Sequence, residues 1–117
     1  MVRDRKRCDL QIALARMGGN ANVLREIIEM VRADIPAMLG RLRAAVAAGD
    51  SAAVEREAHS IAGTVVTFNA DAALAAAQRL QSIGHSGELS GAQAATEVLE
   101  QEIALLDKEL QAEVEQR

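Results

Sequence analysis

Apolar residues recur at every third or fourth position in each segment between the glycine- and asparagine-containing breaks of this chain. That period places them on one face of an α-helix, and no segment shows the strict alternation of apolar and polar residues that a half-buried strand needs. The breaks lie at residues 18–20, 49–50, 69–71 and 84–91. Alanine is the commonest residue and Pro36 is the single proline, a composition that also favours helices. The pattern therefore predicts an all-α fold.

The breaks separate one short helical segment from four longer ones, at about residues 10–17, 20–48, 50–68, 71–83 and from 90 onward. Asn20 or Asn22 can cap the second segment and Asp50 the third, because a side-chain oxygen there accepts free backbone N–H groups. Pro36 removes a backbone donor inside the second segment, so we expect a kink there. Short connections make successive helices antiparallel. The expected fold is an antiparallel four-helix bundle with an additional short N-terminal helix.

Composition excludes several classes of function. With 117 residues, 50% of them hydrophobic, and a net charge of −4, the chain has the size and mix of one globular domain. Its aromatic content of 1% is too low for stacking on bases, and its acidity gives no general attraction to nucleic acids or anionic membranes. Cys8 is the single cysteine, so no internal disulfide can form, and no signal-peptide pattern or apolar run of ~20 residues is present. We expect a cytoplasmic, monomeric domain that contacts neither nucleic acid nor membrane.

The two ends of the chain are expected to be polar. Residues 1–8 form a basic, solvated lead-in with Arg3, Arg5, Lys6 and Arg7, and the bundle domain then covers residues 9–115. In this interpretation Cys8 has no particular role, and Phe68 fills the core at the end of the third helix. The glutamates of the last helix are expected to face solvent: Glu97, Glu100, Glu102, Glu109, Glu113 and Glu115.

The third predicted helix holds the position that suggests chemistry. Its apolar residues are spaced four, three, four and three apart, as in the stripe of a bundle core: Val54, Ala58, Ile61, Val65 and Phe68. At ~100° per residue, His59 lies roughly 140° from the middle of that stripe, so its imidazole should face solvent from the middle of a helix.

The neighbours of His59 on the same face suggest a small docking surface. Glu55 lies one turn before His59 and Gly63 one turn after, and they are flanked by Arg56, Ala62 and Val66. A glycine inside a helix costs about 1 kcal/mol relative to alanine, but it leaves room for a partner or a phosphoryl group beside the imidazole. Val66 lies outside the core stripe and can give an apolar contact.

The segment Ala58-His59-Ser60-Ile61-Ala62-Gly63-Thr64, followed by Phe68-Asn69-Ala70, resembles the signature of the histidine phosphotransfer (HPt) domain family. In that family the phosphorylated histidine is followed by a lysine three residues later and by a glycine four residues later. The turns at residues 16–20 and 49–50 also resemble the family's usual sequence, and the resemblance runs from about residue 9 to residue 110.

The resemblance implies a phosphorelay phosphocarrier, not an enzyme with kinase or ATP-binding machinery of its own. His59 would accept a phosphoryl group from the aspartate of a receiver domain and pass it to another. The partners would be receiver domains of response regulators or of hybrid histidine kinases, and the receiver would supply the acidic pocket and Mg²⁺. No cofactor or metal is expected in this chain, because His59 and His85 come without a ligand-spaced set of cysteines or carboxylates. His85 is expected in a Gly-Ser loop.

One departure from the family pattern leaves two functions open. The usual lysine is replaced by Ala62, and Arg56 on the same face can supply part of the missing positive charge. Glu55 can hold the imidazole N–H of His59 and fix its orientation, or it is a solvated carboxylate. The alternative function is a non-catalytic module, a degenerate HPt domain that binds a receiver or another regulator without carrying phosphate.

Overall fold

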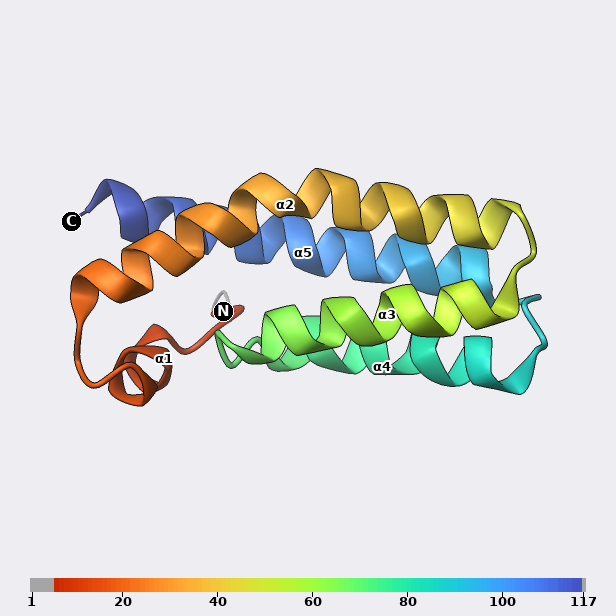
Figure 1. Ribbon diagram of the computed structural model, residues 1–117, viewed down its shortest axis with the longest axis horizontal. Coiled ribbons are helices and arrows are strands. Elements are labelled where there is room, and N and C mark those ends of the chain that lie inside the picture. Colours follow the sequence, from red (N-terminus) through yellow and green to blue (C-terminus); the bar gives the residue numbers. More distant parts are fainter. Residues whose placement is uncertain (1–5, 117) are drawn as a thin grey trace, which may run out of the picture.

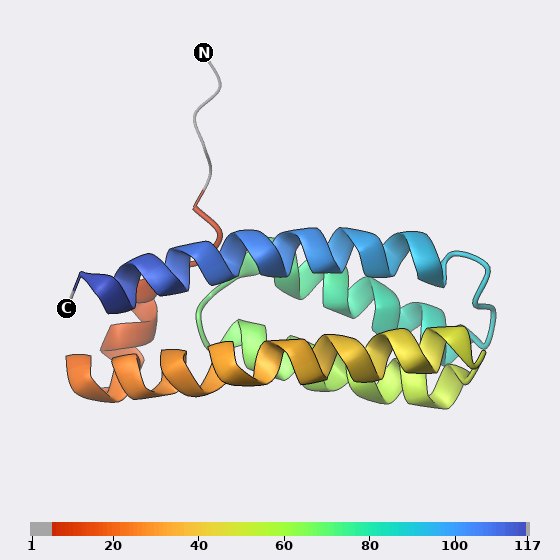
Figure 2. The ribbon, with the colours of Figure 1, turned by 90° about the horizontal axis from the view of Figure 1, so that it is seen from above.

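A computed structural model describes residues 6–116, and within them it contains five helices and no strand. The helices are α1 (Leu10–Arg16), α2 (Ala21–Ala47), α3 (Ser51–Val66), α4 (Asp71–Ser86) and α5 (Ala92–Glu115). The four long helices run antiparallel and form a closed ring, in which α3 and α5 each pack against both α2 and α4 (Figure 1). Helix α1 lies at one end, close to the start of α2 (Figure 2). The predicted all-α, four-helix bundle with a short N-terminal helix is confirmed.

Side-chain caps fix the starts of the first three helices. The Asn20 side chain accepts from two backbone N–H groups at the start of α2, each at 3.1 Å. The Asp50 carboxylate accepts from the N–H of Ala53 at 3.1 Å at the start of α3. Asp9 does the same for α1. The two caps that the sequence suggests at residues 20 and 50 are therefore in place, and they set where α2 and α3 begin.

Helix α2 continues through Pro36 without a break. Proline lacks the N–H that would bond to the carbonyl one turn earlier, and its ring presses on that turn. Figure 1 shows the axis of α2 changing direction near the middle of the helix, in agreement with the kink expected from the sequence.

The core lies between the four long helices and consists almost wholly of alanine and aliphatic side chains. The apolar spacing of α2 predicts a buried stripe of Leu24, Ile27, Val31, Ile35, Met38, Leu42 and Ala45. Four of these residues, Leu24, Met38, Leu42 and Ala45, are buried, whereas Ile27, Val31 and Ile35 are half-buried. Ile28 and Leu39 are also buried. The predicted face is thus confirmed at four positions, and the three half-buried positions all precede Pro36. Within residues 6–116 no helix combines the length and the apolar character that crossing a bilayer requires.

The segment before α1 packs against α5, so the expected solvated lead-in is wrong for Arg7 and Cys8. Cys8 is 8% exposed, and its Sγ donates to Glu109 Oε1 at 3.3 Å. The backbone N–H of Arg7 donates to Glu109 Oε2 at 2.6 Å, and its guanidinium pairs with Glu102 at 3.3 Å. Two carboxylates on α5 hold this segment, which the basic composition alone does not predict. Residues Arg3 and Arg5 lie outside the described residues.

The same segment also contacts the end of α3. The backbone N–H of Asp9 donates to the carbonyl of Phe68 at 2.9 Å. The Phe68 ring is completely buried, which confirms the prediction that it fills the core there.

The glutamates of α5 do not form one solvated face. Glu100 is half-buried and pairs with Arg43 of α2, while Glu102 and Glu109 bind the segment before α1. Glu97 and Glu115 are exposed, as expected. Arginines of α2 and of the segment before α1 lie beside α5 and pair with its glutamates. The helical period of α5 alone does not predict these partners.

Helix α4 ends three residues later than predicted. It includes Gly84 and His85 and ends at Ser86, and Gly87 follows with a positive φ of 77° that only glycine adopts readily. His85 is therefore part of the last turn of α4, not of a loop. The sequence suggests a break at the first of several glycines, whereas the helix tolerates that glycine and stops at the second.

Candidate functional site

The apolar spacing of α3 turns His59 outward. Val54, Ala58, Ile61 and Val65 are at most 3% exposed, and they fix the buried face of the helix. His59 lies in the middle of α3 and is exposed, as the sequence predicts.

A side chain of α4 contacts the His59 ring. Gln81 Nε2 lies 3.1 Å from His59 Nδ1, and Gln81 is half-buried between the two helices. Within the described residues no hydrogen bond is made to the other ring nitrogen, Nε2. The two nitrogens of the imidazole thus differ, one held by an amide and one open to an incoming group.

Sequence reasoning missed Gln81. Apolar spacing in the fourth helical segment places Leu74, Ala77 and Leu80 on its buried face, and Gln81 follows Leu80 directly, so the helical period places it at the edge of that face. Only the pairing of α3 with α4 and the register between them bring it to His59. That register depends on tertiary packing, which a single sequence without a partner helix does not reveal.

Glu55 bonds to His85 and not to His59. Its Oε2 lies 3.0 Å from His85 Nδ1 across the α3–α4 boundary. The expectation that Glu55 holds the imidazole of His59 is therefore not met in this structure. The reason is geometric, because the last turn of α4 brings a second imidazole opposite Glu55.

A glycine sets the distance between α3 and α4 at this point. A Cβ added at Gly84 would lie 2.5 Å from the backbone nitrogen of Glu55 and 2.9 Å from the carbonyl oxygen of Ser51. Such contacts are too short for any side chain, so the two backbones approach closely only because residue 84 has none. This approach brings Gln81 and His85 within reach of α3.

The other predicted site residues divide into exposed and buried ones. Gly63 is exposed with open space around it, Val66 is 42% exposed, and Arg56 is exposed and pairs with Glu57 at 3.6 Å. Ala62 is only 8% exposed, so its expected place on the open surface is wrong. It belongs to the buried core of the bundle.

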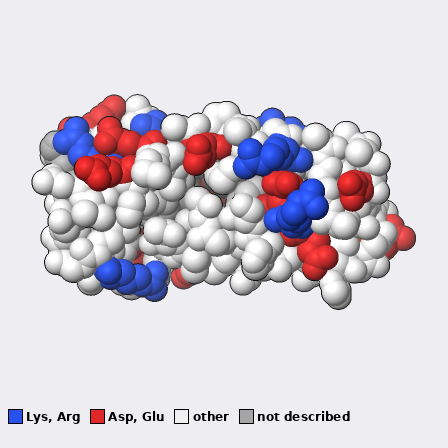
Figure 3. Space-filling view, in the orientation of Figure 1, with Lys and Arg blue, Asp and Glu red and all other residues white. Residues whose placement is uncertain are grey.

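The surface beyond His59 carries no charge along α3. Residues 58–70 contain no Asp, Glu, Lys or Arg. In Figure 3 the area over the C-terminal half of α3 is uncharged, whereas basic and acidic side chains lie beside one another over α2 and the first half of α3. The end of α1 borders this area, since the Arg16 guanidinium donates to the Val66 carbonyl at 3.4 Å. His59 thus lies at the edge of a neutral surface.

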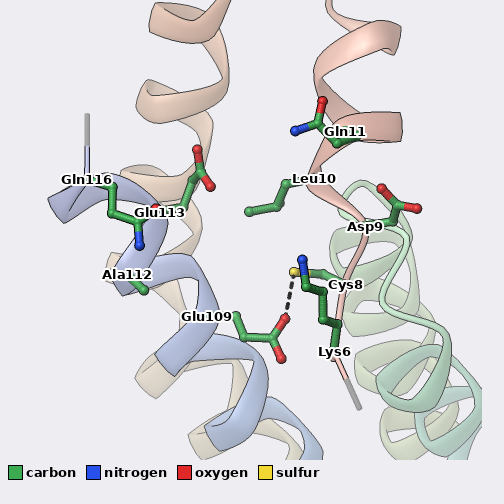
Figure 4. A pocket seen from close by; sticks show the side chains of 9 residues that line it. All are labelled: Lys6, Cys8, Asp9, Leu10, Gln11, Glu109, Ala112, Glu113 and Gln116. Carbon is green, nitrogen blue, oxygen red and sulfur yellow. Dashed lines mark hydrogen bonds between the residues drawn. The ribbon is translucent and has the colours of Figure 1, made fainter. Parts of the chain in front are cut away.

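Hollows lie beside the His59–Gln81 contact and beside the segment before α1. A shallow groove of about 410 Å³ lies beside the His59–Gln81 contact, and its lining residues are Glu55, Gln78, Gln81, Ser82, His85 and Ser86. A larger pocket, of about 570 Å³, lies between the segment before α1 and the last turns of α5 (Figure 4). None of the predicted site residues lines the larger pocket.

The thiol in the larger pocket is unreactive. Burial, together with the hydrogen bond to Glu109 and the charge of that carboxylate, raises the pKa of Cys8 to about 12. Figure 4 shows the sulfur directed at Glu109. A thiol that stays protonated at neutral pH is a poor nucleophile, so Cys8 acts as a packing residue. Residues 6–116 contain no cluster of three or more His, Cys, Asp or Glu arranged to hold a metal ion.

Comparison with known proteins identifies the family of this chain. The family model described as "Hpt domain" matches residues 26–115. The solved structure of histidine-containing phosphotransfer protein B (HptB) from Pseudomonas aeruginosa PAO1 superposes with a TM-score of 0.89 and 23% identity, over 97% of this chain and 99% of that one. At that identity the likeness shows a shared fold, and no curated protein gives a significant match. Since the family model covers most of the sequence, including the helix that presents His59, this chain belongs to the Hpt domain family.

Proposed function

We propose that this chain is a phosphorelay phosphocarrier, in which His59 accepts a phosphoryl group from a receiver-domain aspartate and passes it to another receiver. Domains of this family are phosphocarriers rather than enzymes. The observation that carries the proposal is the exposed imidazole in the middle of α3, with Nδ1 held by Gln81 and Nε2 open.

The open position of Nε2 favours this nitrogen as the nucleophile. An imidazole nitrogen attacks through its lone pair, so the proton must then be on Nδ1. In the structure the amide nitrogen of Gln81 lies 3.1 Å from Nδ1 and can only donate, which places the ring proton on Nε2. A half-turn of the amide exchanges its nitrogen and oxygen, and the oxygen then accepts Nδ1–H. In the transfer the P–O bond to the aspartate breaks, its carboxylate leaves, and the N–P bond forms. The ring gains positive charge, which the Gln81 carbonyl stabilises.

The surroundings of His59 suit the approach of a folded partner. Gly63 leaves open space one turn after His59, and the exposed Val66 gives an apolar contact on the neutral surface. A receiver brings its own acidic pocket and Mg²⁺, and a surface without carboxylates beyond His59 does not repel it. The proposed partners are receiver domains of response regulators or hybrid histidine kinases, the proposed location is the cytoplasm, and the proposed state is a monomer.

The test is transfer of label from a phosphorylated receiver in the presence of Mg²⁺. The chain should acquire label that is lost in acid and kept in base, as expected for phosphohistidine. His59→Gln should abolish the label, whereas His85→Gln, which alters the second histidine of the chain, should retain it. Label that survives His59→Gln would refute the assignment.

One observation favours a second candidate, a receiver-binding module that carries no phosphate. Position 62, where the family has a lysine, is a buried alanine and supplies no cation. Binding of a receiver with no label on any histidine, in the same assay, would establish this function in place of the carrier.

A further inference from the structure

Two contacts join α3 and α4 at the site, one helical turn apart. His59 meets Gln81 at 3.1 Å, and Glu55 meets His85 at 3.0 Å. Glu55 precedes His59 by four residues, and Gln81 precedes His85 by four, so each same-helix pair is separated by about 5–6 Å between Cβ atoms. A carboxylate and a second imidazole therefore lie one turn from the proposed phosphoacceptor.

The position of Glu55 creates an electrostatic problem for phosphorylation. A phosphoryl group on His59 carries up to two negative charges, and a free carboxylate one turn away repels it through solvent. Ala62 offers no positive charge to offset this, and the Arg56 guanidinium, which also pairs with Glu57, can offset only part of it. The chain needs some other means of keeping Glu55 from opposing the transfer.

In the structure, His85 holds the carboxylate of Glu55 through a hydrogen bond. A carboxylate can only accept hydrogen bonds, so the Nδ1 of His85 must carry the proton in its contact with Glu55. The two side chains are 80% and 39% exposed, and such a surface pair adds little to the free energy of unfolding. The Glu55–His85 pair therefore matters because of its position beside His59, where the lack of a side chain at Gly84 lets α3 and α4 approach closely.

We propose that His85 is a positioning residue for phosphotransfer: its Nδ1–H holds the carboxylate of Glu55 against α4, so that a phosphoryl group on His59 does not face a free carboxylate. The proposal rests on the proposed function of His59. It differs from direct assistance, in which His85 would itself bind the phosphoryl group. The two roles respond differently when Glu55 is neutralised.

The experiment uses phosphoramidate as the donor, since this small molecule needs no docking surface. The P–N bond of phosphoramidate breaks, ammonia leaves, and a new P–N bond forms to the imidazole of His59. Rates of phosphohistidine formation are measured for the full chain and for His85→Ala, Glu55→Gln and the double variant, with thermal unfolding recorded for each. These four rates form a double-mutant cycle.

His85→Ala should lower the rate roughly three- to tenfold when Glu55 is present, the size expected for one free carboxylate at this separation in screened solvent. In the Glu55→Gln background the same replacement should change the rate by less than about twofold. An equal fall in both backgrounds contradicts the proposal in favour of direct assistance, and no fall in either contradicts any role of His85.

Arg79→Ala is the matched control. Arg79 is an exposed cation of α4 that does not line the groove beside His59, so its removal should not reproduce the effect of His85→Ala. An equal loss with Arg79→Ala would mean that only the total charge matters and would refute the proposal. Failure of the proposed function is recognised separately, because the full chain and His59→Gln would then both remain unlabelled.

Discussion

The chemistry of a single residue, His59, depends on which of its nitrogens is held. Gln81 contacts Nδ1 at 3.1 Å, and within the described residues Nε2 is left to solvent. An amide can serve either as donor or as acceptor, whereas the proposed transfer requires an acceptor. The function of Gln81 can therefore be tested by changing only the kind of hydrogen bond it makes.

Gln81→Leu should lower the rate of phosphotransfer to His59 about tenfold, which corresponds to about 1.4 kcal/mol in the barrier. Gln81→Glu should recover part of that rate, because a carboxylate accepts Nδ1–H as the amide oxygen does, while its charge opposes the incoming phosphoryl group. The measurement is the initial rate of labelling by a phosphorylated receiver. Equal rates for the Leu and Glu variants would show that no acceptor is required at this position.

Arg56 is the second residue that can be tested alone. It is exposed on the face of His59, with its guanidinium 3.6 Å from Glu57, and it is proposed to supply part of the charge that the lysine gives in related domains. Arg56→Ala should slow transfer about two- to fivefold, since a solvated charge gives a modest stabilisation. Arg41→Ala is the control, because Arg41 also pairs with Glu57 but belongs to α2. Unchanged transfer in Arg56→Ala would contradict this role.

At the scale of the helix, the close approach of α3 and α4 builds the site. Gly84 has no room for a Cβ, and Gln81 and His85 lie on either side of it in α4. One backbone contact therefore sets the register of both contacts between the helices. No cap or apolar spacing in α3 predicts this register, because the register depends on how α3 and α4 pack against each other.

Gly84→Ala should destabilise the chain and weaken the site together. An alanine gains about 1 kcal/mol in helix propensity, but overpacking against the backbone of Glu55 costs typically about 1–3 kcal/mol, so the net loss should be up to about 2 kcal/mol. Gly40→Ala is the matched control in α2, because nothing lies within 4 Å of its added Cβ, and it should stabilise by about 0.5–1 kcal/mol. Denaturant unfolding of both variants checks the signs; a stabilised Gly84→Ala would contradict the close approach.

The elements themselves follow from the sequence to a large extent. The period of apolar residues gives the number and type of the helices, and the side chains at positions 20 and 50 give the starts of α2 and α3. The outward direction of His59 follows from counting 100° per residue. What the spacing does not give is the partner of each polar side chain, as with Gln81, Glu55 and His85, because those contacts join residues 22 or 30 positions apart.

At the scale of the whole molecule, the segment before α1 joins α5 to the residues that follow α3. Arg7 and Cys8 bind carboxylates of α5, and Asp9 bonds to the carbonyl that follows α3. The composition of this segment predicts a basic, solvated tail. Its burial depends instead on carboxylate acceptors about 100 residues away along the chain. Local sequence patterns do not predict such long-range pairs.

The buried thiol gives a pH dependence of stability. The pKa of Cys8 is about 12 in the folded chain, against 9.0 for an unperturbed thiol. Between these values the unfolded chain loses the thiol proton while the folded chain keeps it, so the free energy of unfolding falls as pH rises from 9 toward 12. Cys8→Ala lacks this contribution, and its stability should approach that of the parent chain over the same range. Denaturant unfolding at pH 8, 9.5 and 10.5 tests this; parallel curves would contradict the burial of the thiol.

The phosphoryl group on His59 Nε2 is the central claim, and NMR of the phosphorylated chain tests it most directly. The chain is labelled with ¹⁵N at histidine, phosphorylated by a receiver, and examined for phosphorus coupling to the ring nitrogens. The account predicts one phosphohistidine, with the coupling on Nε2 of His59 and none on His85. A phosphoryl group on Nδ1, on His85, or on no histidine at all would contradict it.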